Sequence, residues 1–197
     1  TGVIGEKFPI SQVLKIITKP QMTKEWMNSA RAIMTTDTFP KGVSVTSMIE
    51  GKRITITGIS KGSGMIEPNM ATMLGFIFID ADFGSEILNK LLKGNISYSF
   101  NSISVDGEES TNDTVILAST RAIKFKKPIK NVNEKRIIDF KKKLKKVFMK
   151  LSELIVRDGE GATKLVEINV LNARNEKDAK IFAKSIANSP LVKTAIH

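Results

Sequence analysis

The spacing of hydrophobic positions changes repeatedly along this chain, and it predicts a mixture of helices and strands. Apolar residues that recur every three or four positions are typical of an amphipathic helix, whereas strict alternation is typical of a half-buried strand. Helices are therefore expected at 9–17, 23–33, 85–92, 112–119, 134–157 and 176–187, with a last one opening at Ser189-Pro190. Strands are expected at 42–49, 53–59, 73–79, 102–106 and 166–170.

The connection between the first two strands indicates how the sheet is built. Glu50, Gly51 and Lys52 form a turn signal between two runs rich in β-branched residues, so these runs are expected to pair as a hairpin. A hairpin is antiparallel, which argues against a purely parallel sheet. The sequence therefore favours an α/β fold, a sandwich of mostly antiparallel sheets flanked by helices.

Nothing in the pattern divides the chain into separate domains. Its 197 residues contain no internal repeat, no low-complexity tract and no linker, and this length suits one domain or a large part of one. The chain opens on Thr1, without an initiator methionine or a signal sequence. We expect residues 1–197 to be the central part of a longer chain.

The net charge of +11 raises the question of nucleic-acid binding. Most of the excess lies between Lys124 and Lys150, where the predicted helix 134–157 places its lysines opposite an apolar stripe. Neither the single Trp nor the single Tyr, which could stack on bases, lies in this stretch. A solvated helix face therefore explains the charge better than a nucleic-acid site. No apolar run approaches the roughly 20 residues of a membrane span, so neither nucleic acid nor membrane is expected as a partner.

The composition excludes several kinds of catalytic site. The chain has no cysteine, which rules out disulfides, zinc–cysteine sites and thiol catalysis, and its one histidine is the last residue, His197. A Ser-His-Asp arrangement is therefore not expected. The glycine loop at 61–64 matches neither phosphate-binding spacing, G-x-x-x-x-G-K-[ST] or G-x-G-x-x-G. No metal and no cofactor are implied.

Acyl transfer can proceed without histidine when the nucleophile carries its own base. A threonine at a new N-terminus attacks through its hydroxyl, while its α-amino group, with a pKa of about 7.7–8.0, accepts the proton. The chain must first be cut just before that threonine. Thr72 suits this role because small Ala71 precedes it and an apolar strand follows. Threonine is common in strands, however, so from the chemistry alone a structural role is the better interpretation.

A longer resemblance changes this interpretation. The run KGSGMIEPNMATML, residues 61–74, resembles the self-cleavage motif of the ornithine acetyltransferase (glutamate N-acetyltransferase) family. Further blocks are similar to that family in the same order: TGVIG (1–5), IMTTDTFPK (33–41), SFNSISVDG (99–107), STNDT (110–114) and DGEGATK (158–164). Together they are spread over nearly the whole chain, so the resemblance is specific.

The resemblance implies an N-terminal-nucleophile-like fold and a function in arginine biosynthesis. Self-cleavage would fall at the 71/72 junction, between Ala71 and Thr72. Thr72 would then take the acetyl group from N-acetylornithine and pass it to glutamate in a ping-pong cycle. Thr1 and Gly2 match the family's oxyanion-hole pair, which stabilises the tetrahedral intermediate.

The resemblance also implies substrate-binding positions at Thr35, Lys61, Thr72 and Glu160. Both substrates carry an α-carboxylate that needs a cation, and Lys61 is a suitable one. Glu160 can accept hydrogen bonds from an amino or acetamide N–H. Without the resemblance, Lys61 would be interpreted as a surface lysine and Glu160 as part of a solvated turn.

The expected partners follow from the same resemblance. The two self-cleaved chains would stay associated and form a heterotetramer in the cytoplasm. Members of this family differ in whether acetyl-CoA can also donate the acetyl group, and no residue of this chain decides whether it is used. Two other functions stay open: a self-processing aminopeptidase-type hydrolase of the same fold, and a non-catalytic basic binding module.

Overall fold

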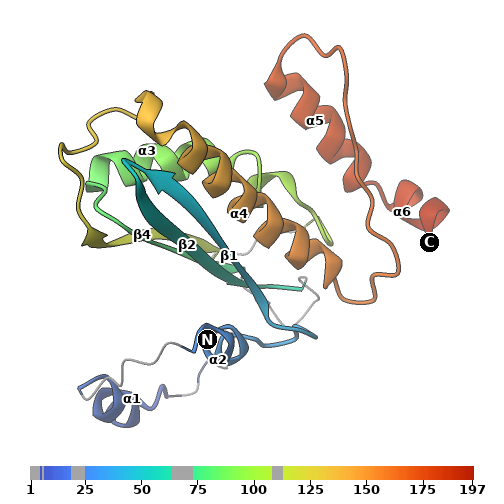
Figure 1. The fold of residues 1–197 in the computed structure, drawn as a ribbon. Helices are drawn as coiled ribbons and strands as arrows, with labels where there is room; N and C mark the ends of the chain where they lie inside the picture. The colour runs from blue at the N-terminus through green and yellow to red at the C-terminus, as the bar shows by residue number, and fades with distance from the viewer. Residues whose placement is uncertain (1–4, 6, 19–24, 64–72, 108–112) are drawn as a thin grey trace.

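The computed structural model describes residues 5, 7–18, 25–63, 73–107 and 113–197 (Figure 1). Two helices come first and three consecutive strands follow; a helix and a fourth strand then precede three helices at the C-terminal end. The elements are α1 (Ile10–Ile17), α2 (Trp26–Ala32), β1 (Lys41–Ile49), β2 (Lys52–Lys61), β3 (Leu74–Ala81), α3 (Ser85–Ile96), η1 (Phe100–Ser102), β4 (Thr114–Ile123), η2 (Lys135–Ile137), α4 (Ile138–Arg157), α5 (Glu176–Ala187) and α6 (Pro190–Ile196).

The four strands form one mixed sheet in the order β1-β2-β3-β4. β1 and β2 pair antiparallel, as do β2 and β3, whereas β3 and β4 pair parallel. The β1–β2 connection is a two-residue turn in which Glu50 and Gly51 have positive φ angles of 51° and 73°. Such turns match the twist of a hairpin, and glycine adopts this conformation without steric cost. The predicted hairpin is confirmed.

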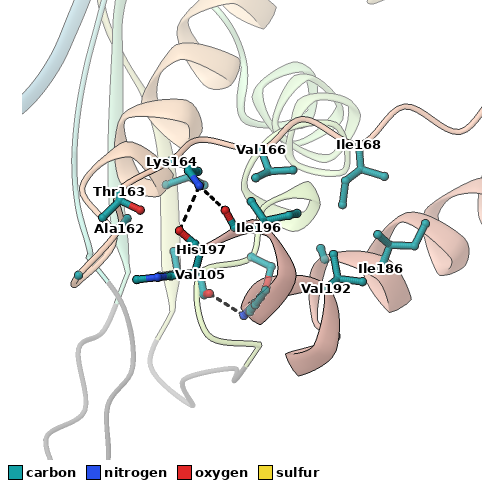
Figure 2. A pocket seen from close by; sticks show the side chains of 15 residues that line it. Val105, Ala162, Thr163, Lys164, Val166, Ile168, Ile186, Val192, Ile196 and His197 are labelled. Carbon is teal, nitrogen blue, oxygen red and sulfur yellow. Dashed lines mark hydrogen bonds between the residues drawn. The ribbon is translucent and has the colours of Figure 1, made fainter.

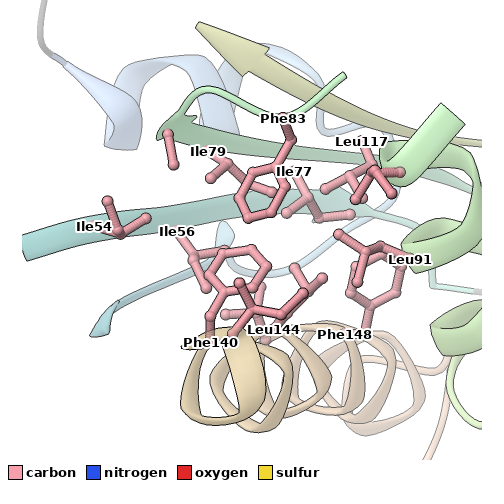
Figure 3. Packing of buried hydrophobic residues seen from close by; sticks show 14 of the residues in the cluster. Ile54, Ile56, Ile77, Ile79, Phe83, Leu91, Leu117, Phe140, Leu144 and Phe148 are labelled. Atoms are coloured by element: carbon pink, nitrogen blue, oxygen red, sulfur yellow. The ribbon is translucent and has the colours of Figure 1, made fainter. Parts of the chain in front are cut away.

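The core lies between the sheet and α4, the long lysine-rich helix. Isoleucines of β2 and β3, among them Ile56 and Ile77, point toward α4, whose Phe140, Leu144 and Phe148 meet them (Figure 3). These five side chains are almost completely removed from water, and burial of each contributes roughly 1.5–3 kcal/mol. The apolar stripe of α4 therefore belongs to the core, and its lysines lie on the outer side.

Gly58 lies at a close contact between the sheet and α4. A Cβ atom at this position would lie 2.7 Å from Cδ1 of Leu151 and 3.2 Å from Cγ1 of Val147. The first contact is shorter than a Cβ atom allows and the second is tight, so a side chain at this position would force Leu151 and Val147 to shift.

Other helices lie around this central packing. α2 places Trp26 against Phe78 of β3, with ring centroids 5.3 Å apart, on the sheet face opposite to that of Ile77. α3 packs beside β4. α6 is tied to the segment after η1, because the Lys193 ammonium donates to the carbonyl oxygen of Val105 at 2.8 Å. In the described part of the chain, no helix has both the length and the apolar character needed to cross a membrane.

The expected α/β class with mostly antiparallel pairing is confirmed, and three local expectations were wrong. Of the expected helix 112–119, residues 114–119 belong to β4, because this apolar run pairs in parallel with β3. The expected strand 102–106 follows η1 and has no strand conformation. The expected strand 166–170 is likewise irregular, since no described strand lies beside it to complete a ladder. The helices expected at 134–157, at 176–187 and from Ser189-Pro190 correspond to η2–α4, α5 and α6.

Candidate active site

The sheet brings Thr35 and Lys61 together, although 26 positions separate them in the sequence. Lys61 is the last residue of β2, and its ammonium group donates a hydrogen bond of 3.2 Å to Oγ1 of Thr35, which precedes β1. Antiparallel pairing of the two strands places their outer ends side by side, with Lys41 opposite Ser60. Lys61 is only 2% exposed, so its interpretation as a surface lysine is wrong.

The surroundings of Lys61 disfavour its charged form. Burial is the largest influence and lowers the pKa of the ammonium group below its ordinary value. The carboxylates of Asp37 and Asp113 oppose this shift, and the positive charge of Lys41 adds to it. A bound anion would compensate the buried charge, so this position suits a substrate carboxylate.

Asp37 anchors the segments on both sides of the Thr35–Lys61 contact. One oxygen of its buried carboxylate accepts the N–H of Gly62 at 2.8 Å and the ammonium group of Lys41 at 2.5 Å. The other oxygen accepts the N–H of Thr35 at 3.1 Å. Burial raises the pKa of Asp37, but these hydrogen bonds outweigh it and hold the pKa below its usual value. Asp37 is therefore a carboxylate that fixes the backbone at two positions.

Asp158 makes a similar connection to the end of α4. It directly follows this helix, and its carboxylate accepts hydrogen bonds from the N–H of Thr38 at 3.0 and 3.2 Å and from the Thr38 hydroxyl. It also pairs with the ammonium group of Lys41, whose side chain is fully buried. Lys41 thus joins the loop before β1 to the loop after α4.

Glu160 belongs to the loop after α4 and is tied to the end of β2 by its backbone. Its N–H donates to the carbonyl oxygen of Ser63 at 2.8 Å, and the hydroxyls of Ser63 and Thr36 lie 2.6 Å apart. The residue itself is exposed. Three segments therefore meet here, and we call them the site loops: residues 35–38, 61–63 and 158–160.

Four predicted site residues lie outside the described part of the chain: Thr1, Gly2, Ala71 and Thr72. Met73, the first described residue after Thr72, lies beside the site loops. A Cβ atom on Gly62 would be 3.5 Å from Cα of Met73, and Lys61 pairs in register with Leu74. The N–H of Met73 donates to Asp113 at 2.9 Å. The start of β3 is thus held next to Lys61.

Sequence reasoning missed the buried charges Asp37, Lys41 and Asp158. All three occur inside the blocks IMTTDTFPK and DGEGATK, which is the one signal that could have drawn attention to them. Their burial could not be read from the sequence, because charged residues are normally exposed and these become buried only when three distant segments meet.

A pocket of about 210 Å³ is lined by Val156 and Gly161, on either side of the 158–160 loop in the chain, and by the segments that follow (Figure 2). Its walls come mainly from the 161–168 segment, α5 and α6, and apolar side chains such as Val166, Ile168 and Val192 point into it. Lys164 turns its ammonium group toward the backbone oxygens of Ile196 and His197. The pocket includes neither Thr35 nor Lys61, so we assign the candidate site to the site loops. Within the described ranges, no three potential metal ligands lie together.

Comparison with known proteins gives a consistent result over the whole chain. The sequence matches the ArgJ family over residues 1–197. It is 47% identical over 199 residues to "Arginine biosynthesis bifunctional protein ArgJ, mitochondrial" of Dictyostelium discoideum, covering 100% of this chain and 45% of that protein. It is 49% identical to the corresponding protein of Caldanaerobacter subterraneus subsp. tengcongensis, covering 100% of this chain and 49% of that protein.

A solved structure supports the same relationship at the level of the fold. The crystal structure of the arginine biosynthesis bifunctional protein of Bacillus halodurans superposes with a TM-score of 0.59 at 38% sequence identity. The superposition covers 64% of this chain and 58% of that one. The chain spans about half the length of the curated relatives it matches. Since the family match covers every residue and the relatives share nearly half of the sequence, the chain belongs to the ArgJ family.

Proposed function

We propose that the full-length protein is a glutamate N-acetyltransferase that transfers the acetyl group of N-acetylornithine to glutamate. It first cleaves its own backbone between Ala71 and Thr72, which converts Thr72 into an N-terminal nucleophile. Membership of the ArgJ family supports this function, as do the names of its relatives, which describe arginine biosynthesis proteins.

The observation that carries the proposal is the arrangement of the site loops around Lys61. A buried ammonium group contacts the Thr35 hydroxyl, the loop of Glu160 is bonded to Ser63, and the chain leaving Thr72 enters β3 beside Gly62. Three proposed substrate-binding positions, which lie far apart in the sequence, are therefore connected to one another.

The proposed reaction has two half-reactions with the same nucleophile. The Thr72 hydroxyl attacks the acetyl carbon of N-acetylornithine, and the α-amino group of Thr72 takes its proton. Donors from Thr1 and Gly2 stabilise the oxyanion. The amide C–N bond then breaks, the departing nitrogen receives the proton, and ornithine leaves an acetyl ester on Thr72. The amine of glutamate attacks the ester carbon and loses a proton to the α-amino group of Thr72. The ester C–O bond then breaks, the Thr72 oxygen takes up this proton, and N-acetylglutamate leaves.

Recognition in this proposal depends on charges that suit both substrates. N-acetylornithine and glutamate each carry an α-carboxylate, and the buried Lys61 ammonium would bind it through a charge-assisted hydrogen bond. The Thr35 hydroxyl would contribute a second polar contact beside it. The exposed carboxylate of Glu160 would accept a hydrogen bond from the substrate nitrogen. One site can therefore hold donor and acceptor in turn, as a ping-pong cycle requires.

The test begins with the intact mass of the full-length protein under denaturing conditions. Two chains with their junction at Ala71/Thr72, together with glutamate-dependent release of ornithine, are the expected result. Thr72→Ala should remain uncut and inactive, while Thr46→Ala, a change at an exposed position of β1, should behave as wild type. A Thr72→Ala protein that still turned over would refute the proposed nucleophile. Ornithine release at the same rate without glutamate would instead identify a hydrolase.

Assembly, compartment and donor range are parts of the proposal with separate measurements. We expect the two cleaved chains to remain together as a heterotetramer, which native mass measurement would detect. We expect a cytoplasmic location. The Dictyostelium relative is named as mitochondrial, so cell fractionation is needed to check this expectation. An assay with acetyl-CoA in place of N-acetylornithine would decide whether it also serves as donor.

A further inference from the structure

Lys41 carries the charge at the centre of the site loops without contacting Lys61 or Thr35 through any described hydrogen bond. Its side chain is fully buried at the start of β1, and its ammonium group pairs with the carboxylates of Asp37 and Asp158. A buried ammonium group is tolerated only when its charge is compensated, and two carboxylates compensate it here. Lys41 therefore acts on these carboxylates, and a substrate would meet other groups.

Each of the two carboxylates holds a different part of the site. Asp37 receives the backbone N–H groups of Thr35 and Gly62, and so fixes both sides of the proposed carboxylate-binding position. Asp158 receives the N–H and the hydroxyl of Thr38 and begins the loop that contains the proposed nitrogen acceptor. The Lys41 ammonium group pairs with both carboxylates and so connects these two sets of hydrogen bonds.

We propose that Lys41 is a positioning residue: by joining Asp37 and Asp158, it holds the site loops in one arrangement and leaves the Lys61 ammonium group free to bind an anionic substrate group. This inference rests on the proposed function, since it concerns the binding of amino-acid carboxylates at the same site. Lys41 itself takes no part in acetyl transfer.

The dependence of Lys61 on Lys41 follows from their shared neighbour. Asp37 is paired with the Lys41 ammonium at 2.5 Å, and it also attracts Lys61 electrostatically. When Lys41 loses its charge, Asp37 keeps its two backbone N–H partners but loses its paired cation, and it draws Lys61 toward itself, away from Thr35. The substrate carboxylate then has to compete with Asp37 for the same cation, so the Michaelis constants rise.

A purely structural ion pair would behave differently, and a second substitution separates the two roles. Lys41→Met removes the central charge, whereas Lys41→Met/Asp37→Asn also removes the carboxylate that would capture Lys61. The asparagine side chain of the double variant would still offer one oxygen to one of the two backbone N–H groups that Asp37 binds. The positioning role predicts that the double variant recovers substrate binding relative to Lys41→Met. A structural role predicts that the second change adds further damage.

The experiment uses the full-length, self-cleaved protein and compares wild type, Lys41→Met, Lys41→Arg, Lys41→Met/Asp37→Asn and the exposed control Lys142→Met. The readouts are kcat and KM for N-acetylornithine and glutamate, with direct binding of glutamate by calorimetry. Misplacement of binding groups by about 1 Å can reduce activity ~100-fold. We expect KM to rise roughly 10- to 100-fold in Lys41→Met with little change in kcat. We expect substantial recovery in Lys41→Arg and in the double variant, and wild-type values for Lys142→Met.

The pH profile gives an independent readout. The charged groups that influence Lys61 are Asp37, Asp113 and Lys41, and the last of these lowers its pKa. Removing the charge of Lys41 should therefore move the alkaline loss of kcat/KM to higher pH, whereas Asp37→Asn should move it to lower pH. An alkaline limb that stays unchanged in both variants would contradict the electrostatic coupling of Lys61 to Lys41 and Asp37, and with it the positioning role.

The outcomes separate the two proposals. If wild type turns over with glutamate and Lys41→Met keeps its KM values, or loses only kcat, the positioning role is refuted while the proposed function stands. If wild type neither binds nor uses glutamate, the proposed function fails and this inference fails with it. If Lys41→Met does not fold, the decision rests on Lys41→Arg and the double variant. Wild-type KM values in the double variant support the inference, and values as poor as those of a Lys61→Met protein overturn it.

Discussion

The ammonium group of Lys61 lies 3.2 Å from the hydroxyl oxygen of Thr35. The carboxylate of Asp37 accepts hydrogen bonds from the backbone N–H of Thr35 and from that of Gly62, the residue after Lys61. The cation and the hydroxyl are thus fixed relative to each other before any substrate arrives. Such preorganisation lowers the cost of ordering a binding site.

Lys61→Met should weaken substrate binding without lowering the stability of the fold. The methionine keeps the apolar stem but loses the charge, so a substrate carboxylate loses a charge-assisted hydrogen bond of about 1.5–3 kcal/mol. We expect KM for both substrates to rise roughly 10- to 100-fold. Because burial disfavours the ammonium group, the melting temperature should equal or exceed that of wild type. Steady-state kinetics and calorimetry measure the two effects, with Lys142→Met as the control, and unchanged KM values would refute the binding role.

Glu160→Gln should weaken substrate binding without loosening the site loops. The carboxylate is exposed, while the residue is tied to Ser63 by its backbone N–H, which the substitution leaves in place. We expect kcat/KM to fall about 10- to 100-fold, the cost of one charge-assisted hydrogen bond, with no change in melting temperature. Glu86→Gln, at another exposed carboxylate, is the matched control. Equal kcat/KM values for the two variants would refute the binding role and show that Glu160 is only part of a solvated turn.

The stability contributed by Asp37 should depend on pH in a defined direction. Its pKa in the folded protein is lower than the ordinary value of 3.8, so folding favours the carboxylate. This contribution is fully present above the unfolded pKa and is lost as pH falls through the lower, folded pKa. Asp37→Asn breaks a buried pair and should cost about 3–5 kcal/mol near neutral pH.

The measurement for Asp37 is the free energy of unfolding in urea as a function of pH. The difference between wild type and Asp37→Asn should be constant from pH 7 to about pH 5 and should narrow below about pH 4. Asp139→Asn, at another carboxylate that accepts a hydrogen bond from Ser47, serves as the comparison. A difference that grew on acidification would contradict the assignment.

Gly58→Ala should destabilise the fold by steric overlap at the sheet–helix contact. The added Cβ would meet Cδ1 of Leu151 at 2.7 Å, and overpacking of this kind costs typically about 1–3 kcal/mol. Gly94→Ala is the matched control, because nothing lies within 4 Å of its Cβ position in α3 and alanine favours helix. Urea denaturation should therefore give opposite signs for the two variants. A Gly58→Ala protein as stable as wild type would show that α4 can move away from β2 at little cost.

The features that local sequence determines were predicted well. The β1–β2 hairpin follows from Glu50-Gly51 between two alternating runs, because a two-residue turn and a period of two are both local properties. α4 follows from an apolar stripe that repeats at helical spacing and enters the core as a unit. The motif blocks named Thr35, Lys61 and Glu160, and the structure connects their loops.

Other features were decided only by contacts between distant segments. β4 was expected to be a helix, because a short apolar run fits either period and only its partner β3 selects the strand. The burial of Lys61 was not predicted: without the resemblance it would be interpreted as a surface lysine, yet it is 2% exposed. Lys41 and Asp158 are 117 positions apart. Their pairing depends on the packing of α4, which places Asp158 next to the start of β1. Whether a charge is buried and paired depends on which segments meet, so tertiary structure alone could decide it.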